Sequence, residues 1–465
     1  MKKNCLLIIL TIIVQHVSGQ FASQNISLLS NFDDLAVVAE PQYGLRYQGC
    51  WGWADTLTGK EYGIIGSTSG TYIIDVTNPA APVQRSYVST RQNNLIWHEY
   101  KTFGKYLYII SDGPSNNQLQ ICDLSYLPDS VHVVYDSHAL FSRAHTIFMD
   151  GNRMYLGTVS GTTSHSMQVY SLNNPVSPVL LRSLEQDYPS INIVHDMFVT
   201  HDTVYASCGS QGLHIFKYDS VANQFSELGT LTTYQEQGYN HSSVLSEDHS
   251  TLYMCDESSG KAVKVVDVTT IHNPTVDTIF RSHVGAIAHN PYVKGNYLYV
   301  AYYLDGVYVY NISNPRIPVL AGFFDTYPQN GNSFPPSTYD GCWGVYTGLP
   351  SGTLLASDTK KGLFCLDASM ITGLHEFSGS SNEAMIVYPN PVNDVIKIRL
   401  TNKNGIEQTR IEITDSWGRK VKEMSNINFI DGEVQLRLDK FSPGIYLFKV
   451  NTSDRTFVQK VNVVN

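Results

Sequence analysis

Charged residues are scarce in this chain: Asp, Glu, Lys and Arg together make up 15% of its 465 residues, whereas 42% are hydrophobic. A chain of this composition folds into globular domains, because it has enough apolar surface to bury. Long apolar runs are also missing beyond residue 20. A transmembrane helix needs roughly 18 to 20 apolar residues in succession, so we expect none in the mature chain.

Basic residues are few in the body of the chain. Residues 21–385 carry 17 Lys and Arg against 32 Asp and Glu, a formal charge of −15, while residues 386–465 carry 12 against 9. An acidic body repels phosphate backbones and offers no basic stripe, so nucleic acid is excluded as a partner. An acidic surface of this kind favours cations over anions as binding partners.

Motifs of common enzymes and metal folds are missing. The sequence has no G-x-S-x-G elbow, no G-x-x-x-x-G-K loop, no H-E-x-x-H helix and no C-x-x-C pair. The six cysteines beyond Cys5 are an even number, so disulfides are possible in an oxidising compartment, and a Cys50–Cys342 bridge is one candidate. Calcium loops of the Asp-x-Asp type are missing too.

The N-terminus has the pattern of an export signal. Lys2 and Lys3 precede an apolar run from Leu6 to Val14, and the small residues Ser18 and Gly19 follow it. We expect residues 1–20 to be a signal peptide that is removed, and the mature protein to begin near Gln20.

The most informative feature is an internal repeat. A phrase of the form apolar residue, Asp, Val or Leu, Thr or Ser, Asn-Pro recurs along the chain, and each copy follows another strand-like run and a hairpin turn. The seven copies begin at Ile73, Leu119, Met167, Leu213, Val263, Val307 and Leu363. Tyr (30 residues), Gly (34) and Pro (19) are abundant, which favours strands and turns.

About four short strands in a period near 45 residues are typical of a propeller blade. Solenoid stacking is the alternative, but the chain ends favour a closed ring. The last unit stops after its third strand near Ser369, and residues 25–29 form an unpaired strand-like run before the first unit. We therefore predict an all-β protein whose seven-bladed β-propeller spans residues 21–371, with the N-terminus completing the last blade.

A different module follows the propeller. Residues 372–385 include a Gly/Ser-rich linker, and residues 386–465 alternate apolar and polar positions as in a small C-terminal β-sandwich. The Tyr-Pro-Asn-Pro opening at 388–391 and the Pro-Gly-Ile-Tyr run at 443–446 resemble the type A sorting domain of the type IX secretion system of Bacteroidetes. That resemblance implies the type IX secretion machinery as a partner and a secreted or outer-membrane surface location. An ordinary adhesive or carbohydrate-binding β-sandwich is the alternative.

The repeats themselves resemble LVIVD-repeat proteins, and the chain from about residue 25 to 369 is similar to the choice-of-anchor B family. The Ile-Asp-Val-Thr-Asn-Pro phrase at 74–79 and His98-Glu99 carry that resemblance. It implies a propeller at the cell surface, and it brings no settled biochemical activity.

One set of residues points to chemistry. Five consecutive units place a histidine near their first strand, at His98, His145, His195, His241 and His289. In a propeller this strand is innermost, so we expect the imidazoles to form an arc at one mouth of the channel. Imidazole and carboxylate are suitable ligands for zinc, copper, iron or nickel, and a divalent metal is the cofactor we consider.

Other residues are expected on the same face as the histidines. The candidate ligand-binding set is Trp51, Glu99, Asp112, Asp196, Asp256, Asp305, Trp343 and Asp358. Such histidines can instead hydrogen-bond neighbouring turns, and tryptophans of this kind can simply be core residues. The sequence thus favours a surface protein that binds an extracellular ligand, with a metal-dependent hydrolase as the alternative.

Overall fold

The computed structural model describes residues 21–113, 119–328, 339–372, 385–388, 392–400, 409–415, 419–427, 429, 432–438, 441–452 and 456–464. The predicted signal peptide and most of the predicted linker lie outside these residues. The chain divides into two compact units, Met1–Thr372 and Gly373–Asn465. Each unit is described by itself.

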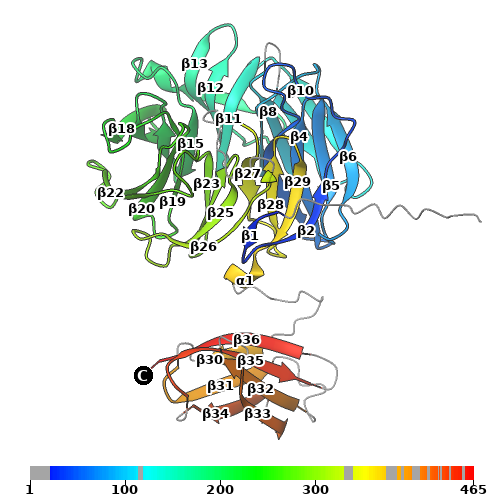
Figure 1. The fold of residues 1–465 in the computed structure, drawn as a ribbon. Helices are drawn as coiled ribbons and strands as arrows, with labels where there is room; N and C mark the ends of the chain where they lie inside the picture. Colours follow the sequence, from blue (N-terminus) through cyan, green and yellow to red (C-terminus); the bar gives the residue numbers. More distant parts are fainter. Residues whose placement is uncertain are drawn as a thin grey trace, which may run out of the picture. The chain divides into compact units, whose positions relative to one another are not determined.

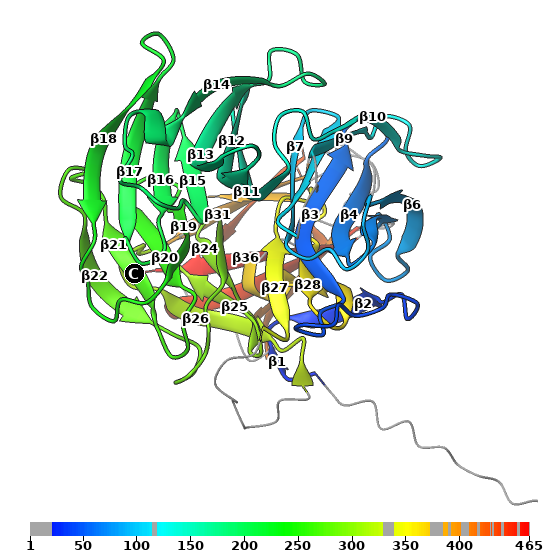
Figure 2. The same cartoon turned by 90° about the horizontal axis from the view of Figure 1, so that it is seen from above.

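Seven antiparallel sheets make up the described part of the first unit, and they are arranged around a central axis (Figures 1 and 2). Tyr, Ile, Leu and Val recur in their inner strands, such as KEYGIIGS at 60–67 and YLYVAY at 297–302, and most residues of these strands are buried. The first three blades are β3 (Tyr47–Asp55), β4 (Lys60–Ser67), β5 (Gly70–Asp75) and β6 (Val83–Ser89); β7 (His98–Phe103), β8 (Tyr106–Ser111), β9 (Leu119–Asp123) and β10 (His132–Ser137); and β11 (Arg143–Asp150), β12 (Arg153–Ser160), β13 (Ser164–Ser171) and β14 (Val179–Ser183).

The remaining four blades follow in chain order. They are β15 (Asp196–Thr200), β16 (Thr203–Ser207), β17 (Leu213–Asp219) and β18 (Gln224–Leu231); β19 (Asn240–Leu245), β20 (Thr251–Asp256), β21 (Val263–Asp267) and β22 (Thr275–Phe280); β23 (Asn290–Lys294), β24 (Tyr297–Tyr302), β25 (Gly306–Asn311) and β26 (Val319–Phe324), with β1 (Ser23–Gln24) added at its edge; and β27 (Cys342–Tyr346), β28 (Leu354–Asp358), β29 (Gly362–Asp367) and β2 (Ser27–Phe32). A 3-10 turn, Leu184–Gln186, and the short helix α1, Ser369–Thr372, complete the unit.

The first strand of each blade contacts the first strand of the next, and β27 contacts β3, which closes the ring. The predicted closure by the N-terminus is confirmed, because β2 pairs antiparallel with β29, from Ser27 opposite Asp367 to Phe32 opposite Leu363. Ile26, just before β2, is buried in the core between the last two blades. The chain end thus covers the sheet edge that β29 would otherwise expose.

Gly362 shows how closely the closing strand approaches its neighbour. It has a φ of +85°, and a Cβ atom at this position would lie 2.1 Å from the backbone oxygen of Phe32. Only glycine combines this backbone conformation with this contact. The hairpin between β28 and β29 therefore requires glycine at this position.

Each blade packs its faces against its neighbours. One apolar cluster joins Tyr47 and Ile65 of the first blade to Leu355 and Leu363 of the last. All six cysteines of the described residues are buried and unpaired, so the candidate Cys50–Cys342 disulfide is not formed. Their thiols lie in apolar surroundings and contribute to the core as small hydrophobic groups.

The second unit has two sheets in the part that the structure describes. One contains β30 (Met385–Tyr388), β31 (Val395–Leu400) and β34 (Glu433–Arg437), and the other β33 (Lys420–Ile427), β32 (Thr409–Asp415), β35 (Gly444–Asn451) and β36 (Thr456–Val463). Ile398, Ile413 and Phe448 are fully buried between them. The predicted C-terminal β-sandwich is thus present. No helix among the described residues is long and apolar enough to cross a membrane.

Candidate functional site

Four of the five predicted histidines form a continuous arc of rings on the propeller axis. The ring centroids of His145 and His195 lie 4.2 Å apart, those of His195 and His241 4.2 Å, and those of His241 and His289 4.4 Å. Trp343 continues the arc at 4.5 Å from His289. Consecutive blades therefore bring these imidazoles together, as the repeat spacing predicts.

His98 lies outside this arc, which corrects the prediction for the second blade. It is fully buried, and its Nδ1 atom lies 3.1 Å from Oε1 of Gln48, on the side facing the first blade. The pairing of β7 with β8 runs without a bulge from His98, so alternate side chains point Glu99 and Lys101 to the axis and His98 away from it. The residue before the strand, Trp97, lines the channel in its place.

Backbone position explains why three of the other histidines and Trp343 face the axis. His241 falls in a β-bulge between Asn240 and Ser242, and Trp343 falls in the same kind of bulge between Cys342 and Gly344. A bulge redirects one side chain relative to the regular alternation of the strand. His195 and His289 each stand one residue before the first strand of their blades. This one-residue difference decides which histidines face the axis.

Two imidazoles have their Nδ1 atoms fixed by neighbouring groups. Nδ1 of His145 lies 2.8 Å from Oδ2 of Asp112, and Nδ1 of His289 donates to the backbone oxygen of Trp343. When Nδ1 carries the proton, Nε2 presents a lone pair, which is the usual arrangement of a histidine that binds a metal. Asp112, a predicted ligand residue, thus supports His145.

One group of donor atoms has the spacing of a metal site. A ligand atom from each of His195, His241 and Glu257 lies within 4.8 Å of the other two. Nε2 of His241 is 3.7 Å from the Glu257 carboxylate, which also accepts a hydrogen bond of 2.6 Å from the Tyr303 hydroxyl. The Nδ1 atoms of His195 and His241 are buried without a hydrogen-bond partner among the described residues.

Burial sets the protonation states of this group. It lowers the pKa of His195 and of His241 well below the ordinary value, and the neighbouring imidazoles lower both further. Burial raises the pKa of Glu257 to about 7, against the opposing hydrogen bond from Tyr303. Both imidazoles are therefore neutral at pH 7, as metal ligands must be.

Three predicted acidic residues lie away from the channel. Asp256 forms a fully buried ion pair with Lys264, at 2.7 Å. Asp305 accepts a hydrogen bond from Ser282 and lies 2.8 Å from Nδ1 of His283. Asp358 accepts hydrogen bonds from Thr326 and from backbone N–H groups at 360 and 361. Each of these carboxylates satisfies polar groups of the loops around it, so the prediction that they approach the histidines is wrong.

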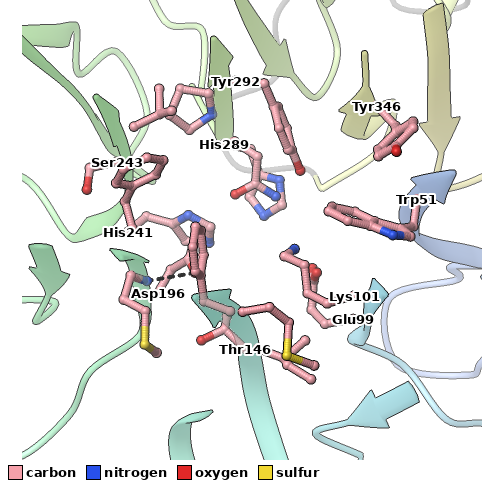
Figure 3. Close-up of a pocket in the computed structure, with 18 of the residues that line it drawn as sticks. Trp51, Glu99, Lys101, Thr146, Asp196, His241, Ser243, His289, Tyr292 and Tyr346 are labelled. Carbon is pink, nitrogen blue, oxygen red and sulfur yellow. Dashed lines mark hydrogen bonds between the residues drawn. The ribbon is translucent and has the colours of Figure 1, made fainter. Parts of the chain in front are cut away.

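The four imidazoles of the arc line part of a cavity of about 400 Å³ (Figure 3). Glu99 and Asp196, both predicted, line it together with Lys101. Trp51 also lines it, donates a 3.1 Å hydrogen bond to Thr102, and has the Lys101 ammonium 4.3 Å from its ring centroid. Burial raises the pKa of Asp196 to about 7, and the Glu99 charge adds to this effect.

Sequence reasoning missed Glu257, Tyr303 and Lys101. Lys101 could have been found, since it stands two residues after Glu99 on a strand and must share its face. Glu257 and Tyr303 follow the second strands of two neighbouring blades, and no local motif distinguishes them from other turn residues. Their contact depends on how the two blades pack.

Fold and site together define a seven-bladed propeller with a histidine-lined channel, followed by a β-sandwich module. Residues 386–464 match the family described as secretion system C-terminal sorting domain, and residues 286–326 match the LVIVD repeat. The second match coincides with the blade from β23 to β26. The sorting domain marks the chain as a secreted or outer-membrane surface protein that uses the type IX secretion system.

Similar solved structures share little sequence with the chain. The extracellular domain of the putative one-component system BT4673 from B. thetaiotaomicron is 10% identical, with a TM-score of 0.46, and the match covers 94% of this chain and 60% of that one. The computationally designed Ika8 protein is 9% identical, with a TM-score of 0.44 and coverage of 92% and 99%. This chain thus spans about 60% of the length of the BT4673 domain. No curated protein matches the sequence.

Proposed function

We propose that this protein is a surface-delivered propeller of the choice-of-anchor B type that binds a divalent transition metal at the mouth of its channel. His195, His241 and Glu257 are the proposed ligands, and the observation that carries the proposal is the 4.8 Å grouping of their donor atoms. Two imidazoles and a carboxylate are a ligand set that suits Zn²⁺ and Fe²⁺. His145, held by Asp112, and His289 lie next along the arc on either side.

Binding is the role that the arrangement supports best. The metal would lie at the end of a cavity on a rigid ring, where it and the channel wall together could hold an extracellular ligand. A metal-dependent hydrolase is the second candidate, because three protein ligands leave coordination positions open for water or substrate. Hydrolysis of ester and peptide substrates by the zinc-loaded protein, lost on removal of the metal, would favour the second candidate.

Metal analysis of protein purified without a nickel column tests the proposal. After chelator treatment, titration with Zn²⁺ or Fe²⁺ should show one tight site, and His195→Ala, His241→Ala and Glu257→Gln should each weaken it by more than 100-fold. His201→Ala is the matched control, because His201 lies exposed in the turn between β15 and β16. Equal affinity in all variants would overturn the assignment of these ligands.

A further inference from the structure

The cavity that the imidazole arc lines also has charged residues that are not among the proposed metal ligands. Glu99 and Lys101 lie on β7 two residues apart, and Asp196 begins β15. Figure 3 shows these three side chains around the same space, with Trp51 beside Lys101. The wall therefore holds one cationic and two acidic groups.

Lys101 and the two carboxylates attract one another across the cavity but form no close ion pair among the residues that the structure describes. Lys101 forms no ion pair within 4.0 Å and no hydrogen bond among the described residues, and the Glu99 and Asp196 carboxylates act on its charge only from a longer distance. Its ammonium also lies 4.3 Å from the centroid of the Trp51 ring. Burial costs these charges hydration, and their mutual attraction offsets only part of that cost: burial still lowers the pKa of Lys101 and raises the pKa of Glu99 and of Asp196. A ligand with complementary charges would recover that cost.

Apolar side chains form the rest of the wall. Met149, Met197 and Phe198 line the cavity, and Tyr292 and Tyr346 lie near Trp51 in the same channel. Methionine and aromatic side chains adapt to apolar groups of varied shape. The cavity thus joins a charged part to an apolar part, and its volume of about 400 Å³ suits a molecule of amino-acid or dipeptide size.

We propose that the cavity binds a zwitterionic ligand of the α-amino-acid class, with its carboxylate at Lys101, its ammonium at Glu99 and Asp196, and an apolar side chain against the methionines. Alternate residues of a strand lie roughly 6.6 Å apart, so Lys101 can bind the carboxylate of the ligand while Glu99 binds its neighbouring ammonium. A neutral sugar would leave all three charges unpaired, and a simple anion would leave both carboxylates unpaired. This site does not depend on the proposed metal.

Calorimetric titration of the full mature chain in the presence of EDTA tests the proposal. A panel of the twenty amino acids should contain binders, with apolar ones such as L-leucine the tightest. Lys101→Met and Glu99→Gln should each weaken binding by about 10- to 100-fold, the usual effect of losing a hydrogen bond to a charged group. Lys105→Met is the matched control, because Lys105 lies exposed in the turn after β7 and pairs with Asp123.

Ligand analogues test the same point on the unaltered protein. N-acetyl-L-leucine lacks the ammonium and L-leucinamide lacks the carboxylate, so both should bind at least tenfold more weakly than L-leucine. The proposal is overturned if no amino acid binds at millimolar concentration, if both analogues bind as tightly as L-leucine, or if binding requires the metal. Binding of L-leucine by His195→Ala would separate this site from the metal site.

Discussion

Buried carboxylates at the ends of the second strands of the blades accept hydrogen bonds from the loops and do not line the channel. Asp358 is fully buried, and three donors from two loops converge on it. Burial raises its pKa to about 6, although these hydrogen bonds oppose the shift. Between about pH 4 and pH 6, the Asp358 carboxyl is therefore protonated in the folded protein but ionised in the unfolded chain.

This shift predicts how stability depends on pH. The free energy of unfolding should fall as pH rises through that window, because the ionised carboxylate is disfavoured in the folded state. Asp358→Asn removes the titration while an amide keeps an acceptor oxygen. Between pH 4 and pH 7, the free energy of unfolding of the variant should therefore rise by about 3 kcal/mol relative to that of the unaltered protein, measured by urea unfolding. A difference that stays constant with pH would contradict this account.

A second carboxylate predicts a different outcome. Asp256 and Lys264 are both inaccessible to solvent and lie 2.7 Å apart. Lys264→Met should lower the free energy of unfolding by about 3 to 5 kcal/mol, since it leaves a buried charge uncompensated. The pair of exposed Lys105 and buried Asp123, at 2.8 Å, is the control, and Lys105→Met should cost much less stability than Lys264→Met, because the lysine ammonium is in contact with water.

The double variant checks the reason for that loss. Asp256→Asn combined with Lys264→Met removes both charges, so it should recover much of the stability lost by Lys264→Met alone. Additive losses in the two single variants would show that packing, rather than the uncompensated charge, causes the effect.

For single residues, the repeat predicted which histidines come close together in most blades. It did not predict on which side of the strand each residue lies. The spacing of the histidines placed four imidazoles on the axis, because each blade repeats the same strand at the same radius. The error at His98 arose from a single residue, since β7 lacks the bulge found in β19 and β27. Bulges have no reliable sequence signature, so the side of the strand on which a residue falls could not be predicted.

Among the strands, β2 closes the ring by completing the last blade. Ile26, the residue just before it, is 4% exposed, whereas Leu28 within it is 39% exposed. Ile26→Ala should lower the free energy of unfolding by about 2 to 4 kcal/mol, because it leaves a cavity between two blades. Leu28→Ala, in the same strand, should cost no more than about 1 kcal/mol. Equal losses measured by chemical denaturation would contradict the packing described for this strand.

The closing strand was predictable from sequence for a simple reason. A ring of four-stranded blades cannot leave one blade with three strands without exposing an edge, and the chain offered one unassigned strand at its start. The register of Ser27 with Asp367 could not be predicted, because it depends on the bulge between Leu28 and Ser30.

For the whole molecule, the two compact units predict independent roles. A chain ending at Thr372 keeps every blade and the closing strand, so it should melt cooperatively at nearly the same temperature as the full protein. It should no longer reach the cell surface, because it lacks the sorting domain. Fractionation of cells that express each form measures this, and a truncated protein still found outside the cell would contradict it.

The pairing of β2 with β29 also determines how the propeller responds to force. When the C-terminal module is held at a surface, tension on the chain enters the ring through α1 and β29. That strand is hydrogen-bonded along both edges, to β28 and to β2. A pull at its end loads two ladders at once, in shear rather than one bond at a time. The ring is thus tethered through a strand in the interior of a sheet, with hydrogen bonds along both of its edges.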